Sequence, residues 1–142
     1  MAMMPFCGYD MGAYFQHWLD FSRKSKKLPR IFQVNWFRRG KDGRFIWPGY
    51  GENLRVLQWI VGRVNGEAEA VETPIGNLPA PGSLDLKGLD LPKGAIEELL
   101  YVDREGWLKE VSSFEKFFKT FGDRFPKALW QEYWNLIARL QS

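Results

Sequence analysis

The sequence predicts an α/β fold, which for a chain of this length amounts to an α+β piece: a short hairpin and strands flanked by about five helices. Three observations support this class. The residue pattern over 31–65 predicts a strand, a loop and a helix in succession. Apolar residues recur at helical spacing in three other segments. The hydrophobic content of 45% over 142 residues suffices for one compact domain.

Composition excludes several classes of protein. A single cysteine, Cys7, cannot form an internal disulfide, and one histidine, His17, cannot complete a Cys/His metal cluster. No apolar run approaches the roughly 20 residues of a membrane span. Residues 1–20 also lack the basic-then-apolar order of a signal peptide. We therefore expect an intracellular protein with no membrane partner.

The net charge of +3 is unevenly distributed. Residues 1–45 hold nine Lys/Arg against three Asp/Glu, whereas residues 65–142 hold nine against thirteen. The N-terminal third is therefore expected to face anions. The basic run from Arg23 to Arg30 has a simpler interpretation, a solvated helix end and linker.

The first predicted helix begins after Asp10, a plausible N-cap, and ends near Ser22–Lys24. Its apolar residues are Met11, Tyr14, Phe15, Trp18 and Leu19. His17 is expected on the polar side or flank, as a surface residue rather than a catalyst. The preceding segment, Met1–Tyr9, has no cap and no charge, which suggests a piece cut from a larger protein.

A hairpin is predicted next. The alternation of Ile31–Phe37 is typical of a strand, Lys41–Gly43 supplies a tight turn, and Arg44–Trp47 forms the return strand, which Pro48–Gly51 ends. Glu52 and Asn53 then open a helix that Asn65–Gly66 closes. The predicted apolar face of this helix is Leu54, Leu57, Ile60, Val61 and Val64.

The second half of the chain is predicted to be mainly helical. Glu67–Thr73 is expected to be a short strand that ends before Pro74, and residues 75–92 are expected to be coil. A short helix is predicted over Gly94–Leu100. The segment 103–140 is predicted to pack through two helices, one capped by Asp103 and stopped by Gly122, the other begun by Pro126. Their apolar stripes are Trp107, Leu108, Val111, Phe114, Phe118 and Phe121, and Leu129, Trp130, Tyr133, Trp134, Ile137 and Leu140.

The stretch 35–53, NWFRRGKDGRFIWPGYGEN, concentrates aromatic, basic and glycine residues. A purine is apolar on its faces and polar along its edge, so a selective site needs aromatic plates and a few hydrogen-bonding groups. Phe37, Phe45 and Tyr50 can supply the plates. Gly49 and Gly51 have no side chains and so leave their backbone groups accessible to a ligand. The side-chain amide of Asn53 carries both a hydrogen-bond donor and an acceptor. The alternative is that the phenylalanines and Trp47 form the hydrophobic face of a hairpin.

Several catalytic motifs are absent from the sequence. It contains no G-x-x-x-x-G-K-[ST] phosphate loop, no nucleophile elbow and no metal-ligand cluster. We therefore predict no catalytic and no metal-binding residue in this chain. A nucleotide bound here would be held by its base.

The segment NWFRRGKDGRFIWPGYGENLRVLQWI closely resembles the base-binding segment of GTP-dependent phosphoenolpyruvate carboxykinase. The family pattern there is N-W-F-R…G-x-F-x-W-P-G-[FY]-G-E-N-x-R-V-L-x-W. MAMMPFCGYDMGAYFQHWL resembles the segment just upstream, TPIG and LDLKGL match downstream markers, and GWLKEVSSFEKFF resembles the penultimate helix. The resemblance runs nearly end to end and weakens over the last twenty residues.

The resemblance implies a two-lobed α/β, kinase-like enzyme of the cytoplasm. It would convert oxaloacetate and GTP to phosphoenolpyruvate, GDP and CO2 in gluconeogenesis, with manganese and magnesium. Carried over to this sequence, Phe37, Phe45 and Tyr50 would enclose guanine, and Asn53 would hydrogen-bond its edge. Tyr50 stands where vertebrate members commonly have phenylalanine. Trp47, like the tryptophan before Phe37, would be a structural support.

The family's phosphate loop, metal ligands, substrate-binding arginines and lid correspond to nothing in this chain. Residues 1–142 are thus expected to be a single partial domain, the C-terminal part of the nucleotide-binding lobe, whose partner is the rest of the carboxykinase chain. A fragment, or a reading frame that begins at an internal methionine, would explain why the chain resembles only this part of the family. We expect the isolated 142-residue chain to be inactive. The alternative is an aromatic and basic module that binds single-stranded nucleic acid or another partner without catalysis.

Overall fold

The computed structural model describes residues 4–142, so the first three residues of the expected N-terminal segment lie outside the described part. The chain divides into two compact units. The helical unit joins Met1–Pro29 to Asp103–Ser142, and the loop unit is Arg30–Val102. The expectation of one partial domain remains a prediction.

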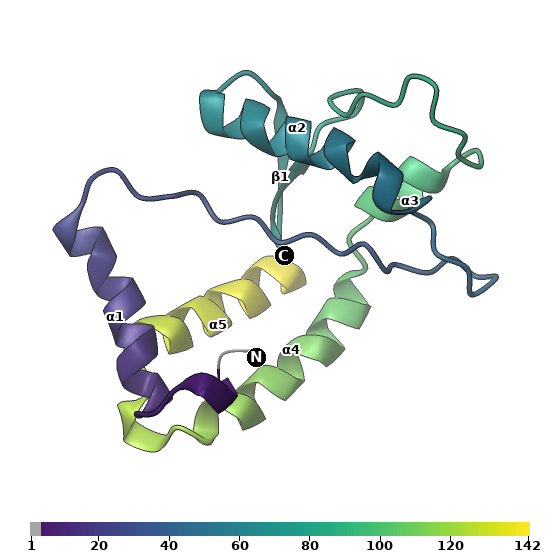
Figure 1. The fold of residues 1–142 in the computed structure, drawn as a ribbon. Helices are drawn as coiled ribbons and strands as arrows, with labels where there is room; N and C mark the ends of the chain where they lie inside the picture. The colour runs from purple at the N-terminus through teal and green to yellow at the C-terminus, as the bar shows by residue number, and fades with distance from the viewer. Residues whose placement is uncertain (1–3) are drawn as a thin grey trace. The chain divides into compact units, whose positions relative to one another are not determined.

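The helical unit contains three long helices, each close to its predicted position (Figure 1). They are α1 (Met11–Lys24), α4 (Arg104–Lys119) and α5 (Lys127–Gln141), with 3-10 turns at Met4–Phe6 and Gly122–Arg124. The two predicted caps are confirmed: the Asp10 side chain accepts from Gly12 N at 2.8 Å, and that of Asp103 accepts from Gly106 N at 3.0 Å. Each cap satisfies a backbone N–H that the first turn leaves unpaired.

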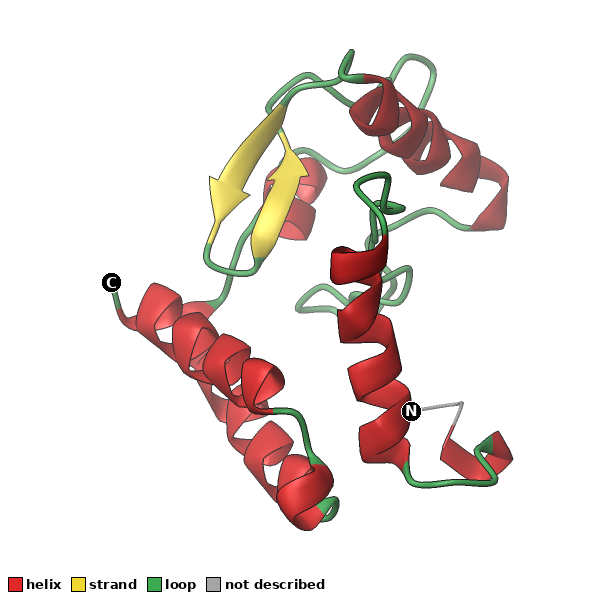
Figure 2. Ribbon diagram, turned by 90° about the vertical axis from the view of Figure 1, so that its left-hand side faces the viewer, coloured by secondary structure: helices red, strands yellow, loops and turns green. Residues whose placement is uncertain are grey.

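The core of the helical unit lies where α4 and α5 pack as an antiparallel pair (Figure 2). Arg104, at the start of α4, donates to the carbonyl of Leu140, at the end of α5. Val111 and Leu140 are almost completely buried. The predicted stripes therefore do pack, although Trp134 remains 54% exposed.

Aromatic rings fill much of this core. Phe125 stacks on Phe118 with ring centroids 4.3 Å apart, and Trp130 meets Phe118 edge to face at 5.4 Å. Phe15 of α1 contacts Phe125 at 5.5 Å. Such pairs stabilise beyond the apolar area that they bury.

The start of α1 lies directly against the turn before α5. A Cβ built on Gly12 would collide with the backbone carbonyl of Arg124, so only glycine fits there. The Arg124 side chain reaches back to Asp10, with Nε 3.1 Å from Oδ2. Asp10 therefore both caps α1 and forms an ion pair with Arg124.

The loop unit contains α2 (Asn53–Asn65), the strands β1 (Ala70–Thr73) and β2 (Gly76–Pro79), and α3 (Ala95–Leu100). The strands form an antiparallel hairpin in which Ala70 lies opposite Pro79 and Thr73 opposite Gly76 (Figure 2). Strand β1 agrees with the prediction. The predicted coil over residues 75–92 is wrong for β2, because Pro74 and Ile75 make a two-residue turn and Gly76 supplies a φ of 121°.

The predicted strands at Ile31–Phe37 and Arg44–Trp47 are wrong. The tight turn between them forms, with Gly43 at φ 76°, but the only pairing among residues 31–47 is the isolated bridge Arg39↔Phe45. A strand needs a neighbour to take its backbone hydrogen bonds. Within the described part of the chain, Ile31 has no neighbouring strand and is 94% exposed.

The predicted apolar face of α2 is largely exposed. Leu54, Leu57, Val61 and Val64 are exposed, and the buried residue of the helix is Trp59. Its indole donates to the carbonyl of Glu69 at 3.1 Å. The large ring with a bonding partner is covered, whereas within residues 4–142 only Ile60 of the aliphatic stripe is partly buried. No helix in this described part is long and apolar enough to cross a membrane.

Candidate functional site

Phe37 and Phe45 meet at the base of the tight turn. The Arg39↔Phe45 bridge brings the two sides of the turn together, and the rings lie 5.8 Å apart at an interplanar angle of 63°. Both rings remain open, Phe37 at 69% and Phe45 at 49% exposure. They form an aromatic corner: a flat ligand can stack on one ring and touch the edge of the other, but no space remains between them.

Two arginines hold this corner in place. Arg38 donates to the carbonyls of Leu99 and Tyr101, at 3.1 and 2.9 Å, at the end of α3. Arg39 donates to the carbonyl of Gly43 at 2.6 Å, and its guanidinium lies over the Phe45 ring at 4.2 Å. The sequence predicted basic residues that face anions. In the structure these two side chains bind backbone and an aromatic face.

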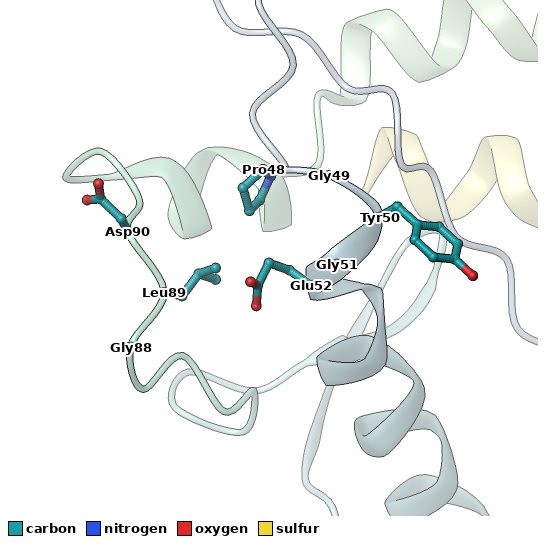
Figure 3. Close-up of a pocket in the computed structure, with 8 residues that line it drawn as sticks. All are labelled: Pro48, Gly49, Tyr50, Gly51, Glu52, Gly88, Leu89 and Asp90. Carbon is teal, nitrogen blue, oxygen red and sulfur yellow. The ribbon is translucent and has the colours of Figure 1, made fainter.

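The loop after the turn lines a hollow of about 340 Å³, shown in Figure 3. Its walls are Pro48, Gly49, Tyr50, Gly51 and Glu52 on one side and Gly88, Leu89 and Asp90 on the other. The side chains of Glu52 and Leu89 point toward each other across it. The ring of Tyr50 points away from it and is 91% exposed (Figure 3).

One arginine links Glu52, in one wall of this hollow, to Asp85, which precedes the other wall in sequence. Arg55, in the first turn of α2, pairs with Glu52 at 2.6 Å and donates to the carbonyl of Asp85 at 2.8 Å. Because the Arg55 side chain is only 19% exposed, solvent screens this pair less than most surface pairs. Sequence reasoning missed Arg55, although a charged residue three positions after Glu52 in a helix is a recognisable pairing signal.

Trp47 and Asn53 are joined by a hydrogen bond across the loop. The indole Nε1 donates to Asn53 Oδ1 at 2.9 Å. Trp47 is 6% exposed, and Asn53 is the first residue of α2. Gly49, between them, adopts a φ of 129° that few residues other than glycine tolerate.

The structure thus divides the predicted site into three parts. Phe37 and Phe45 come together in the aromatic corner. Gly49 and Tyr50 line the hollow, with the Tyr50 ring outside it. Asn53 is bound to Trp47, which sequence reasoning took only as a support. Among residues 4–142 no three His, Cys, Asp or Glu side chains gather as metal ligands would.

Comparison with known proteins identifies the family. The family model of the phosphoenolpyruvate carboxykinase C-terminal P-loop domain matches residues 1–139. The chain is 53% identical over 142 residues to the phosphoenolpyruvate carboxykinase [GTP] of Chlamydia felis, a match that covers 99% of this chain and 24% of that protein. The protein of the same name from Neocallimastix frontalis is 54% identical over 144 residues, with the same coverage.

A third relative, the phosphoenolpyruvate carboxykinase [GTP] of an Arthrobacter species, is 52% identical over 99% of this chain and 23% of its own length. The chain therefore spans about a quarter of the length of the curated relatives that it matches. None of these names describes a nucleic-acid-binding protein, so the alternative of a nucleic-acid module finds no support. Since the family model covers nearly all of its residues, this chain belongs to the GTP-dependent phosphoenolpyruvate carboxykinase family.

Proposed function

We propose that this chain carries the guanine-recognising wall of a GTP-dependent phosphoenolpyruvate carboxykinase. The enzyme would be a lyase that converts oxaloacetate and GTP to phosphoenolpyruvate, GDP and CO2. The aromatic corner carries the proposal: two open rings fixed in edge-to-face contact within the segment that resembles the family's base-binding pattern. Stacking on such a ring contributes about 1 to 3 kcal/mol per base.

In this proposal each site residue has a distinct task. The guanine ring stacks on Phe37 or Phe45, and Tyr50 closes over the exposed face, since its ring is free to turn. Gly49 keeps the loop backbone in a conformation that brings Asn53 to the base edge. Asn53 then supplies the hydrogen bond that tells one purine from another.

The chemistry of the phosphates is assigned to other parts of the enzyme. Arg38 and Arg39 are engaged with backbone carbonyls next to the corner, so they are poorly placed to serve as a phosphate clamp. Phosphoryl transfer needs a phosphate cradle and metal ions to neutralise developing charge. The sequence has no phosphate loop, and the described residues offer no ligand cluster for manganese or magnesium. We therefore propose that this chain alone does not turn over substrate. We also propose, from the family resemblance, that the enzyme acts in the cytoplasm.

A binding experiment tests the assignment. The 142-residue chain is titrated with GDP, ADP and a short single-stranded oligonucleotide, and binding is followed by tryptophan fluorescence and by calorimetry. GDP is expected to bind more tightly than ADP, and the oligonucleotide is expected not to compete with it. Equal affinity for the two nucleotides would contradict guanine recognition, and preferential binding of the oligonucleotide would favour the nucleic-acid alternative.

A second experiment tests the proposed absence of turnover. The chain is incubated with oxaloacetate, GTP and manganese, and formation of phosphoenolpyruvate is measured. A full-length carboxykinase from a relative serves as the positive control. Product above the uncatalysed rate would show that this chain holds catalytic groups that we have not recognised.

A further inference from the structure

A buried indole fixes the orientation of the amide that we assign to base recognition. Trp47 Nε1 lies 2.9 Å from Asn53 Oδ1, and Trp47 is 6% exposed. An indole N–H can only donate, so it can pair with the oxygen of the amide but not with its NH2 group. Turning the amide over would leave a buried donor facing two other donors, at the full cost of an unsatisfied group.

The same contact occupies the oxygen of the Asn53 side chain. The N-cap position of α2 belongs to Glu52, so helix capping makes no demand on the Asn53 amide. Asn53 is the first residue of α2, and its oxygen is already engaged with Trp47. Its NH2 group, with two donors, is therefore the part of the side chain that is left for a ligand.

Guanine and adenine differ where such a donor would meet them. Guanine carries the acceptor O6 at the position where adenine carries the donor N6–H2. An amide free to turn could satisfy either base, with its NH2 group toward guanine or its oxygen toward adenine. An amide held with its oxygen engaged satisfies only guanine, and polar sites reject a ligand that leaves their groups unpaired.

We propose that Trp47 is the positioning residue that makes this site selective for guanine over adenine, because it holds the Asn53 amide with its NH2 group toward the base. This inference rests on the proposed function, in which Asn53 faces the base edge. Trp47 itself touches no base and acts only through Asn53. Selectivity would then reside in a residue outside the base-contacting set.

The decisive variant is Trp47→Phe in the full chain, which removes the donor and keeps an aromatic ring. Affinities for GDP, inosine diphosphate and ADP are measured by isothermal titration calorimetry, which does not depend on indole emission. We expect the preference for GDP over ADP to fall about tenfold, the equivalent of one hydrogen bond. Inosine diphosphate should follow GDP in this loss, because it has O6 but lacks the 2-amino group.

Trp36→Phe is the matched control. Trp36 packs against Trp47 with ring centroids 6.2 Å apart, and its indole makes no hydrogen bond to Asn53. This variant should change the packing in a similar way and leave the preference among the three nucleotides unaltered. In an Asn53→Ala background, Trp47→Phe should have no further effect on the preference, since the two residues act as one unit.

Asn53→Asp gives an independent test if Trp47→Phe fails to fold. The carboxylate can still accept from Trp47 but cannot donate, and its negative charge suits the start of α2. GDP and inosine diphosphate should each bind at least about tenfold more weakly to this variant. Retained GDP affinity would show that the oxygen faces the base and would overturn the inference.

The outcomes separate this inference from the proposed function. If the parent chain prefers GDP and Trp47→Phe keeps that preference undiminished, the inference is wrong and guanine recognition stands. If the parent chain shows no preference for GDP, both fail together. A loss of preference in Trp36→Phe equal to that in Trp47→Phe would also overturn the inference, because packing alone would then explain it.

Discussion

Two parts of this chain are rich in aromatic residues and use them in opposite ways. In the helical unit the rings pack on one another, and Phe125 and Tyr133 are 4% and 6% exposed. In the segment 35–53, Phe37 and Tyr50 are 69% and 91% exposed. Tyr133 belongs to the stripe of α5 and Phe125 to the turn just before that helix, whereas Phe37 lies beside the tight turn and Tyr50 in the 3-10 turn before α2. The aromatic content of a segment alone therefore predicts neither a core nor a binding site. Whether its rings are buried or exposed depends on the local backbone.

The largest expected effect is on a buried ring. Phe125→Ala should destabilise the chain by about 3 to 5 kcal/mol, because it removes the stack on Phe118 and leaves a cavity. Urea unfolding followed by circular dichroism measures the loss. Phe37→Ala, at an exposed ring, is the control and should cost less than about 0.5 kcal/mol. Similar losses in the two variants would erase the distinction between the regions.

A backbone effect is expected in the segment 35–53. Gly49→Ala should cost about 1 to 3 kcal/mol, because alanine strains at the φ of 129° even though nothing crowds its Cβ. GDP affinity should fall with it, as measured by calorimetry. Gly51 has equally open surroundings and no positive φ, so Gly51→Ala should leave both quantities nearly unchanged. Equal effects at the two glycines would argue against a conformational requirement.

The helical unit also depends on its caps. Asp103→Ala should lower the free energy of unfolding by about 1 kcal/mol, because the N–H of Gly106 loses its acceptor. Asp103→Asn keeps an acceptor oxygen and should restore most of the stability. Thermal unfolding at constant pH compares the three chains. A cap without measurable effect would mean that packing of α4 alone fixes its start.

The smallest expected effect on stability is at Tyr50. Tyr50→Ala should change the free energy of unfolding by less than about 0.5 kcal/mol, since the ring is 91% exposed. GDP affinity should nevertheless fall by about fivefold or more through lost stacking. Tyr50→Phe keeps the ring face and should preserve both values. Unaltered GDP binding in Tyr50→Ala would remove this residue from the site.

Local signals predicted the helices well. Asp10 and Asp103 as caps, Gly66 after α2 and Pro126 before α5 mark ends that the structure keeps within a few residues. Each of these signals acts through neighbouring residues, so the sequence contains the whole interaction. Strands depend on partners elsewhere. Residues 31–37 have a strand's alternation but no partner in the described part of the chain, and β2 formed where glycine and proline suggested coil.

The candidate site was predictable to a similar degree. The turn at Lys41–Gly43 indicated that Phe37 and Phe45 would approach each other, and they do. The wall formed by Gly88–Asp90 comes from a distant segment, and nothing near residue 50 signals it. The bond from Trp47 to Asn53 depends on how one loop folds back. Its only sequence trace is a donor-only side chain six residues before an amide.

The close approach of Gly12 to Arg124 has a consequence for the order of folding. During synthesis α1 emerges well before the turn against which it packs. The whole of Arg30–Val102 is produced in between and can fold first. Until then Phe15 lacks Phe125 as a neighbour, and closing so long a loop slows the search. The helical unit is thus expected to form after the loop unit.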